Sequence, residues 1–411
     1  MFFWPGRIPF LLSNMGSLTA LDYHKKTAAY FQQQQQAWSF FSTHHLREEQ
    51  LKDFKTGLLK NSYRFTEAAE TGLYEKVKTA KEKLELSLPV ILYQAEHTAE
   101  MGAGIAYLDN EAHIVFSGNI IQHLSGEELL AVIGHELSHV HLYTQQNGEV
   151  EVADRMVSAI ANHHGTTPAH YETARLFRLY TEIFCDRGAY MVTGHYAPII
   201  SSLVKLSTGL NTVNADSYIQ QAEDIFSADA QTKTSGISHP ENFIRARAIW
   251  FWHSRQNEAD TLTRQMIEGH TSIEDLDLFK QQEITQLTEQ LVQLILQPEW
   301  MKTPNTLALA KQYFNHFSPN VPAGTGTIAA QVQQLHNNLQ DYLAYVLYDF
   351  ATNDKQLEDV PMGYCFYIAD ELNMSRSFAA TVKKEKKLTD KKLQSLKKQT
   401  LAEYQNTVNK L

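Results

Sequence analysis

Two histidines and a glutamate, His135, Glu136 and His139, have types and spacing suited to holding and using a metal ion. In a helix, His135 and His139 lie one turn apart on the same face, so two imidazole rings can bind one ion. Glu136 lies between them and can take a proton from a metal-bound water molecule. The sequence therefore predicts metal-activated hydrolysis, with Glu136 as general base.

A catalytic zinc ion usually has three protein ligands and one water, so the chain must supply a third ligand. We expect this ligand to be Glu182, which lies in a helical stretch with Asp186 one turn later on the same face. Asp186 could accept the free ring N–H of a ligand histidine and so fix its tautomer.

Other interpretations of these residues remain open. His141 is a rival third ligand, although it lies about 200° around the helix from His139, and the pair 163–164 supplies two more histidines. Glu182 could instead be a surface acid paired with Arg178 or Arg187.

The sequence before the metal motif predicts the elements that position it. Ser125 and Glu128 form a capping box, which begins the helix that carries the motif. Before that helix, residues 89–93 and 112–117 are strand-like, and Gly102-Ala103-Gly104 and Asp109-Asn110 between them predict turns. Most of the remaining chain predicts helix, including the stretch 18–86.

Composition and charge limit the class of protein. The 411 residues are 43% hydrophobic and 20% charged, as in an ordinary globular protein. The net charge of −10 argues against a general nucleic-acid binder. Cys185 and Cys365 are far apart and predict no disulfide framework, so we expect a reducing, cytoplasmic location.

The N-terminal residues predict neither a signal peptide nor a membrane anchor. Prolines interrupt the apolar residues of the stretch 1–14, and Met15 is a candidate natural start. No run of about 18 apolar residues follows, so we expect no transmembrane helix.

Three motifs occur in a fixed order along the chain. They are the stretch 129–139, which ends in the metal motif, the stretch 182–189, and Ser238-His239-Pro240 followed by Arg245. On these motifs, the region from about Leu73 to Ser254 resembles the peptidase domain shared by the CAAX prenyl proteases, the HtpX heat-shock membrane peptidases and their soluble relatives.

This resemblance implies a fold, a cofactor and a reaction. The fold is α+β: a mostly helical, zincin-like domain with a small β-sheet, flanked by helical regions. One zinc ion is bound by His135, His139 and Glu182, and Glu136 activates water to hydrolyse peptide bonds in proteins or peptides. His239 helps to hold the substrate or the developing oxyanion, with Arg245 nearby. Arg245 and Arg247 could equally be structural partners of the helix of Glu182 or of Asp186. The alternative function is a weakly active, zinc-containing peptide-binding or chaperone-like module.

Two departures from the family bear on the substrate. Relatives commonly have an Asn-Ala-Phe-like segment where this chain has residues 99–104, Ala-Glu-Met-Gly-Ala-Gly, so an asparagine contact to substrate is not implied. The family's membrane helices are also missing, so a prenylated substrate is not implied. We expect residues 113–117 to form an edge strand that binds the substrate backbone by strand addition.

We expect four regions along the chain. They are an N-terminal helical region (1–72), the zinc metallopeptidase domain (73–258), a helical region with a linker (259–327) and a C-terminal helical domain (328–411). The last region is similar to the TerB-like helical domain, in which acidic residues follow an apolar helix. Asp349 and Asp354 could bind a cation there, or could be ordinary acids at a helix end.

The most basic part of the chain lies near its C-terminus, between Lys383 and Lys398. Such a run is usually a solvated helix face, but it could also dock to an anionic surface or partner. A protein partner for the C-terminal helices is therefore one of our expectations.

Overall fold

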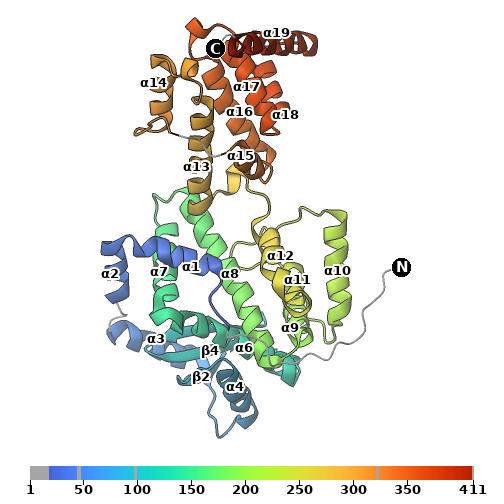
Figure 1. The fold of residues 1–411 in the computed structure, drawn as a ribbon. Helices are drawn as coiled ribbons and strands as arrows, with labels where there is room; N and C mark the ends of the chain where they lie inside the picture. Colours follow the sequence, from blue (N-terminus) through green and yellow to red (C-terminus); the bar gives the residue numbers. More distant parts are fainter. Residues whose placement is uncertain (1–17, 44–47, 97–99, 321–323, 410–411) are drawn as a thin grey trace. The chain divides into compact units, whose positions relative to one another are not determined.

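The computed structural model describes residues 18–43, 48–96, 100–320 and 324–409. The expectations for residues 1–14 and Met15 lie outside the described residues. Helices predominate and accompany one four-stranded sheet, which confirms the α+β fold class (Figure 1). The chain divides into two compact units, the first of residues 1–163 and 174–267 and the second of residues 164–173 and 268–411. The four regions expected from the sequence remain a prediction.

The sheet lies in the first unit and has the order β1-β2-β4-β3. Its strands are β1 (Ser62–Arg64), β2 (Val90–Ala95), β3 (Gly102–Leu108) and β4 (Glu111–Ser117). Strands β2 and β4 are parallel, whereas β1 and β3 pair antiparallel with their neighbours. Alternate residues of β4 are fully buried on one face, namely Ala112, Ile114 and Phe116.

The expected edge strand at 113–117 is wrong, because β4 lies between β2 and β3. The edge strand is β3, which we expected to contain turns. Asp109 and Asn110 both have positive φ, at 52° and 58°, as a two-residue hairpin turn requires. This turn folds the glycine-containing stretch back onto β4 as a strand. The strand β1 likewise interrupts the stretch 18–86 that we expected to be helical.

Helix α6 (Gly126–Thr144) carries the metal motif. The predicted capping box is confirmed: the Glu128 amide donates to the Ser125 hydroxyl, and the Ser125 amide donates to the Glu128 carboxylate at 2.8 Å. The Glu128 carboxylate also accepts from Lys205 at 2.8 Å, on helix α9 (Tyr196–Thr208). These contacts fix the helix that presents His135 and His139.

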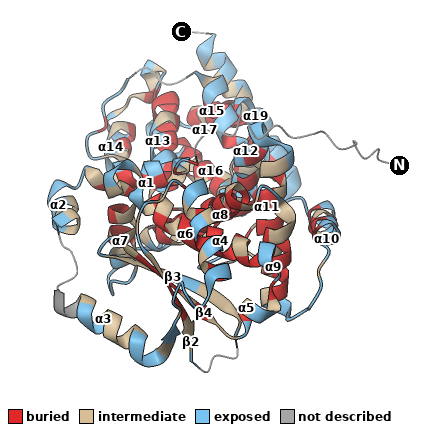
Figure 2. Cartoon of the chain, turned by 90° about the horizontal axis from the view of Figure 1, so that it is seen from below, coloured by how far each residue is buried: buried red, intermediate tan, exposed pale blue. Residues whose placement is uncertain are grey.

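Helix α8 (Pro168–Thr193) lies close to α6 at two glycines. A Cβ atom at Gly134 would lie 3.0 Å from the Cβ of Val192, and one at Gly188 would collide with the side chain of Ser138. Figure 2 shows buried residues concentrated along α6 and α8. The glycines thus allow the motif on α6 to face the acidic residues on α8.

The first unit contains further helices around this pair. They are α1 (Asp22–Gln32), α2 (Gln35–Thr43), α3 (Glu48–Asn61), α4 (Thr71–Lys83), α5 (Ile120–His123), α7 (Glu149–Ala161), α10 (Ala215–Ala228), α11 (Asn242–Ser254) and α12 (Gln256–Glu268). Of the helices described, none is both long and apolar enough to cross a membrane.

The second unit is built from helices around one apolar core. They are α13 (Leu278–Ile295), α14 (Pro304–Tyr313), α15 (Thr325–Val332), α16 (Asn337–Thr352), α17 (Val360–Glu371), α18 (Ser375–Glu385) and α19 (Asp390–Val408). A single cluster of buried side chains runs from Ile284 to Leu393.

The two acids considered as cation ligands in the second unit have hydrogen-bond partners. Asp349 accepts from the Tyr313 hydroxyl at 2.6 Å, and Asp354 accepts from the Thr303 hydroxyl at 2.6 Å and from the Gln356 amide at 3.0 Å. These bonds favour ordinary structural acids. The TerB-like character of the region stays a prediction.

Candidate metal centre

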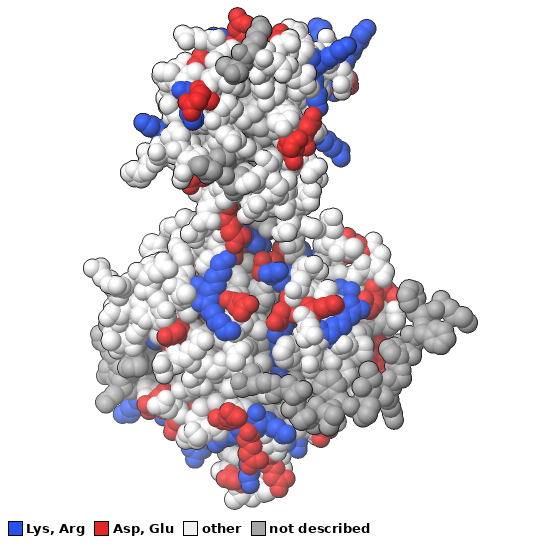
Figure 3. Space-filling view, viewed as in Figure 1, with Lys and Arg blue, Asp and Glu red and all other residues white. Residues whose placement is uncertain are grey.

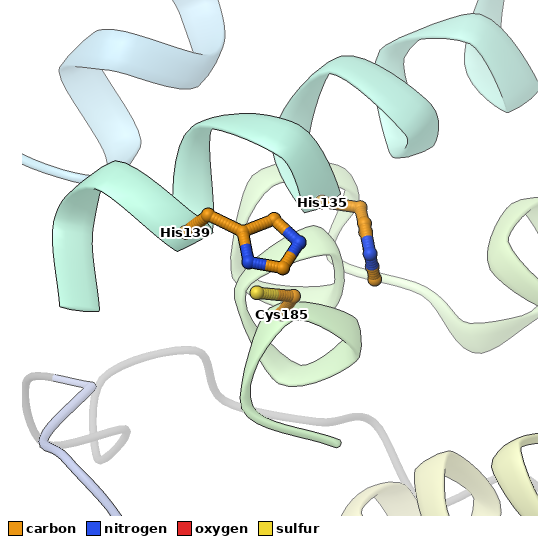
Figure 4. Close-up of side chains that lie close together, drawn as sticks. All are labelled: His135, His139 and Cys185. Carbon is orange, nitrogen blue, oxygen red and sulfur yellow. The ribbon is translucent and has the colours of Figure 1, made fainter. Parts of the chain in front are cut away.

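Helices α6 and α8 bring His135, His139 and Glu182 together. His135 Nε2 lies 3.4 Å from Glu182 Oε2, and His139 Nε2 lies 3.8 Å from Glu182 Oε1. The two rings are nearly perpendicular, with an interplanar angle of 80°, and both project from α6 (Figure 4). Ligands bound at about 2.0–2.1 Å around a tetrahedral zinc ion lie about 3.3 Å apart. The Glu182 carboxylate therefore lies at nearly the separation from each histidine that one shared ion requires.

Glu182 offers a direct test of whether a metal fits here. Its side chain is 8% exposed, and among the described residues Oε2 has no hydrogen-bond partner. A buried carboxylate oxygen that accepts no hydrogen bond is costly, even with the Arg245 guanidinium 3.6 Å away, and a bound metal ion would give it a direct contact. Two imidazole nitrogens and a carboxylate oxygen are also a donor set that catalytic zinc uses. The residues fit the ion that the sequence implies.

Asp186 and Arg245 hold the first histidine. Asp186 Oδ1 accepts from His135 Nδ1 at 3.1 Å, which leaves Nε2 facing Glu182. Arg245, on α11, donates to both oxygens of Asp186, at 2.9 Å and 2.7 Å. Arg245 is buried, with Nη2 3.6 Å from Glu182 Oε2. This geometry favours the interpretation of Arg245 as a structural partner of Asp186.

His239 lies on the open side of the cluster. Its Nε2 is 3.5 Å from Glu182 Oε1, yet its side chain is 59% exposed. The loop that carries it is fixed by Arg175, which donates to the Gly236 carbonyl at 2.7 Å, and by Glu241, which accepts from the Thr234 hydroxyl at 2.7 Å. His239 is therefore both held near Glu182 and accessible to a substrate.

Glu136 is buried between the two histidines of the motif. Burial, together with the nearby charge of Glu182, raises the pKa of the Glu136 carboxyl to about 7. A carboxyl group with a pKa near neutral can both accept and return a proton at physiological pH. This property suits a general base.

The two histidines differ in their affinity for protons. Burial opposes the charged form of His135, but the hydrogen bond to Asp186 and the adjacent Glu182 carboxylate outweigh it and raise the pKa of His135 to about 10. Burial and the charge of His135 lower the pKa of His139 to about 4. Because a metal needs the unprotonated ring, binding of an ion would displace the His135 proton.

The rival ligands lie elsewhere. His141 Nε2 is 3.1 Å from the Leu18 carbonyl oxygen, and the His141 ring stacks on Phe184. His163 and His164 are exposed residues after the end of α7. The alternative for Glu182 was a surface ion pair with Arg178 or Arg187. Arg187 instead pairs with Asp260 at 2.7 Å.

Sequence reasoning missed one side chain at this centre, the thiol of Cys185. Its sulfur and the ring nitrogens of His135 and His139 form a group of atoms within 4.8 Å of one another. Cys185 lies three residues after Glu182, so helical spacing could have placed it on the same face of α8.

Comparison with known proteins bears on this centre. Residues 67–252 match the model of peptidase family M48, and this range contains every residue described above for the site. A similar protein is the plastoglobule-localized metallopeptidase 48, chloroplastic, of Arabidopsis thaliana, 27% identical over 201 residues. The match covers 45% of this chain and 57% of that protein, so the chain spans little more than half the length of this relative. No solved structure matches.

Proposed function

Residues 67–252 belong to peptidase family M48, and from that premise we propose that the chain is a zinc-dependent metalloendopeptidase. Membership of a peptidase family implies protein or peptide substrates. The observation that carries the zinc assignment is the buried Glu182 carboxylate, which lies within 3.8 Å of a nitrogen of each imidazole ring and whose Oε2 accepts no hydrogen bond. One ion per chain would be held by His135, His139 and Glu182.

Different residues of the chain have different roles in the proposed reaction. When bound, zinc would act as a Lewis acid toward water and the scissile carbonyl. Glu136 takes the proton from the attacking water and passes it to the leaving amine. His239, exposed beside Glu182, donates a hydrogen bond to the developing oxyanion. Asp186, held by Arg245, keeps the His135 ring in its ligating orientation.

The substrate would bind along β3. This strand is an edge of the sheet and packs against α6, the helix that carries His135. An edge strand has unpaired backbone groups, so an extended peptide can pair with it. Gly104 is exposed, and open space surrounds the position a Cβ would take there. A substrate side chain would have room at this point.

The substitution Glu136→Gln tests the mechanism. The variant should retain zinc, measured by elemental analysis, because the three ligands are unchanged. Cleavage of casein or a peptide library should fall by at least about 100-fold, since general base catalysis is lost. Cleavage at the wild-type rate would refute the mechanism. If the wild-type protein binds peptides and zinc but cleaves neither substrate, the alternative of a peptide-binding or chaperone-like module is supported instead.

We also propose a protein partner for the second unit and a cytoplasmic location. Residues 375–409 contain nine lysines and arginines against three acids, and such side chains gather where α18 and α19 lie (Figure 3). A partner with an acidic segment would suit this face.

The cytoplasmic location is supported by the two cysteines, which are both free.

Charge reversal tests this partner surface. The variant Lys386→Glu, Lys391→Glu, Lys392→Glu changes three exposed lysines. It should lose binding to a labelled poly-glutamate peptide in fluorescence anisotropy, while its cleavage of a short generic peptide stays unchanged. Equal binding by variant and wild type would remove this proposal.

A further inference from the structure

A buried thiol lies beside the two histidines of the candidate metal centre. Cys185 is fully buried, and Figure 4 shows its side chain on α8 beside the His139 ring, with the His135 ring nearby. The Cys185 sulfur and one nitrogen from each ring lie within 4.8 Å of one another. Among the described residues, these three form a group that could hold a metal ion.

Helical spacing explains why a thiol and a carboxylate face the same pair of rings. Glu182, Cys185 and Asp186 are at positions i, i+3 and i+4 of α8, so all three lie on one side of the helix. Asp186 is bound to Arg245 and His135. Two donors therefore remain for an ion, the Glu182 oxygen that accepts no hydrogen bond and the sulfur of Cys185.

These two donors differ in chemical softness. Carboxylate oxygen suits harder cations, whereas thiolate sulfur selects soft ones, and imidazole accepts both kinds. We propose that His135, His139 and Cys185 form a thiophilic-cation site, which shares both imidazoles with the proposed zinc site. A soft ion such as Cd²⁺ or Cu⁺ would take the Cys185 sulfur in place of the Glu182 carboxylate. This inference rests on the proposed function only in sharing the two histidines.

Binding of a metal ion to this site exchanges a proton for the metal and involves no redox step. The S–H bond of Cys185 breaks, a metal–sulfur bond forms, and the proton passes to the solvent. The metal and the sulfur keep their oxidation states.

The geometry requires a small adjustment. Nitrogen donors at about 2.0–2.1 Å and sulfur at about 2.3 Å from a tetrahedral ion lie about 3.3–3.6 Å apart. The observed donor atoms lie within 4.8 Å, so they must approach one another by at most about 1.5 Å. Rotation of the Cys185 side chain and a tilt of one ring can provide this movement.

The two cysteines allow a matched experiment on the full-length chain. Cys365 is also free and fully buried, but lies in the second unit. Metal-free wild type, Cys185→Ala and Cys365→Ala proteins are titrated with Cd²⁺ alone, and thiolate-to-cadmium charge transfer is followed in the ultraviolet. We expect the absorbance in wild type and in Cys365→Ala, and its loss in Cys185→Ala. The Cd²⁺ dissociation constant of Cys185→Ala should rise at least about tenfold.

A third variant, Glu182→Gln, separates the two sites. It should bind Zn²⁺ at least about tenfold more weakly while keeping the Cd²⁺ absorbance, whereas Cys185→Ala should keep its Zn²⁺ affinity. If Glu182→Gln binds Zn²⁺ like wild type, the proposed zinc site fails but the thiophilic site stands.

Two results would overturn the thiophilic site. One is a Cys185→Ala protein that keeps the charge-transfer absorbance. The other is a Cys365→Ala protein without absorbance, because Cys185 is then the only thiol in the chain. The second result decides the question even if Cys185→Ala does not fold, which circular dichroism would reveal.

Discussion

The helix–helix contacts inside the first unit bury different kinds of residue from those inside the second unit. In the first unit, α6 and α8 enclose Glu136, Glu182 and Asp186, and α11 adds Arg245. In the second unit, the buried face of α17 consists of apolar and small residues from Pro361 to Phe366. Both contacts use a glycine for close approach, Gly188 against Ser138 and Gly363 against the Thr400 backbone.

This difference indicates which helix contacts form a core and which form a chemical site. Buried charge is costly unless it is paired, so a cluster of buried acids and histidines points to a site rather than to a core. The second unit has no such cluster of acids and histidines among its described residues, and its buried Asp277 and Asp354 both accept hydrogen bonds. The catalytic proposal therefore concerns the first unit alone.

The largest change should come from breaking the charged cluster with Asp186→Asn. Arg245 would lose its ion pair, which should lower the free energy of unfolding by about 3–5 kcal/mol. Zinc affinity should fall about 10–100-fold, because His135 loses the carboxylate that orients it. Chemical denaturation and competition with a chelator measure the two effects.

The exposed Asp349 of the second unit is the matched control for this substitution, since it accepts from Tyr313 and is far in sequence from the metal motif. Asp349→Asn should leave zinc affinity unchanged. If Asp186→Asn and Asp349→Asn bind zinc equally well, Asp186 does not position a ligand.

A smaller change should follow from adding one methyl group to the apolar contact of the second unit. A Cβ at Gly363 would collide with the Thr400 carbonyl group, so Gly363→Ala should lower the free energy of unfolding by about 1–3 kcal/mol. Gly57, in α3, has open space around the same position. Gly57→Ala should instead stabilise the protein by about 0.4–1 kcal/mol, because it removes backbone freedom from the unfolded chain. Thermal unfolding would measure both, and a destabilised Gly57→Ala protein would contradict this account.

Low pH should destabilise the first unit more than the second, because the first unit buries a histidine. His24 is fully buried in the first unit: its Nδ1 accepts from the Leu21 amide, and its Nε2 lies 3.2 Å from the Thr181 hydroxyl. Burial lowers the pKa of His24 to about 3. The described part of the second unit buries no histidine.

The lowered pKa of His24 determines the direction in which stability changes with pH. The unfolded chain, with a histidine pKa of about 6.5, binds the proton first, so stability is full above about pH 6.5 and falls as the pH drops toward 3. Between pH 7 and 5 the loss should be about 2 kcal/mol. The variant His24→Gln should show a loss smaller by this amount in urea unfolding at the two pH values. An identical pH dependence in both proteins would show that His24 does not titrate as its burial implies.

Local features of this protein could be predicted because they depend on spacing within one element. The capping box of Ser125 and Glu128 and the one-turn separation of His135 and His139 follow from helical geometry alone. The three motifs that carry the family resemblance likewise lie in short stretches, and the region that contains them matches the model of peptidase family M48.

The sequence alone determined which helix carries the two histidines, because the helical repeat relates neighbouring residues directly. Only the tertiary structure decided that β3 and not β4 is the edge strand, that Arg245 binds Asp186, and that the Cys185 thiol faces both rings. The strand order depends on a hairpin turn at Asp109 and Asn110, and the other two contacts join helices distant in sequence. Such pairings arise from the packing of whole elements, which no periodicity within a single stretch specifies.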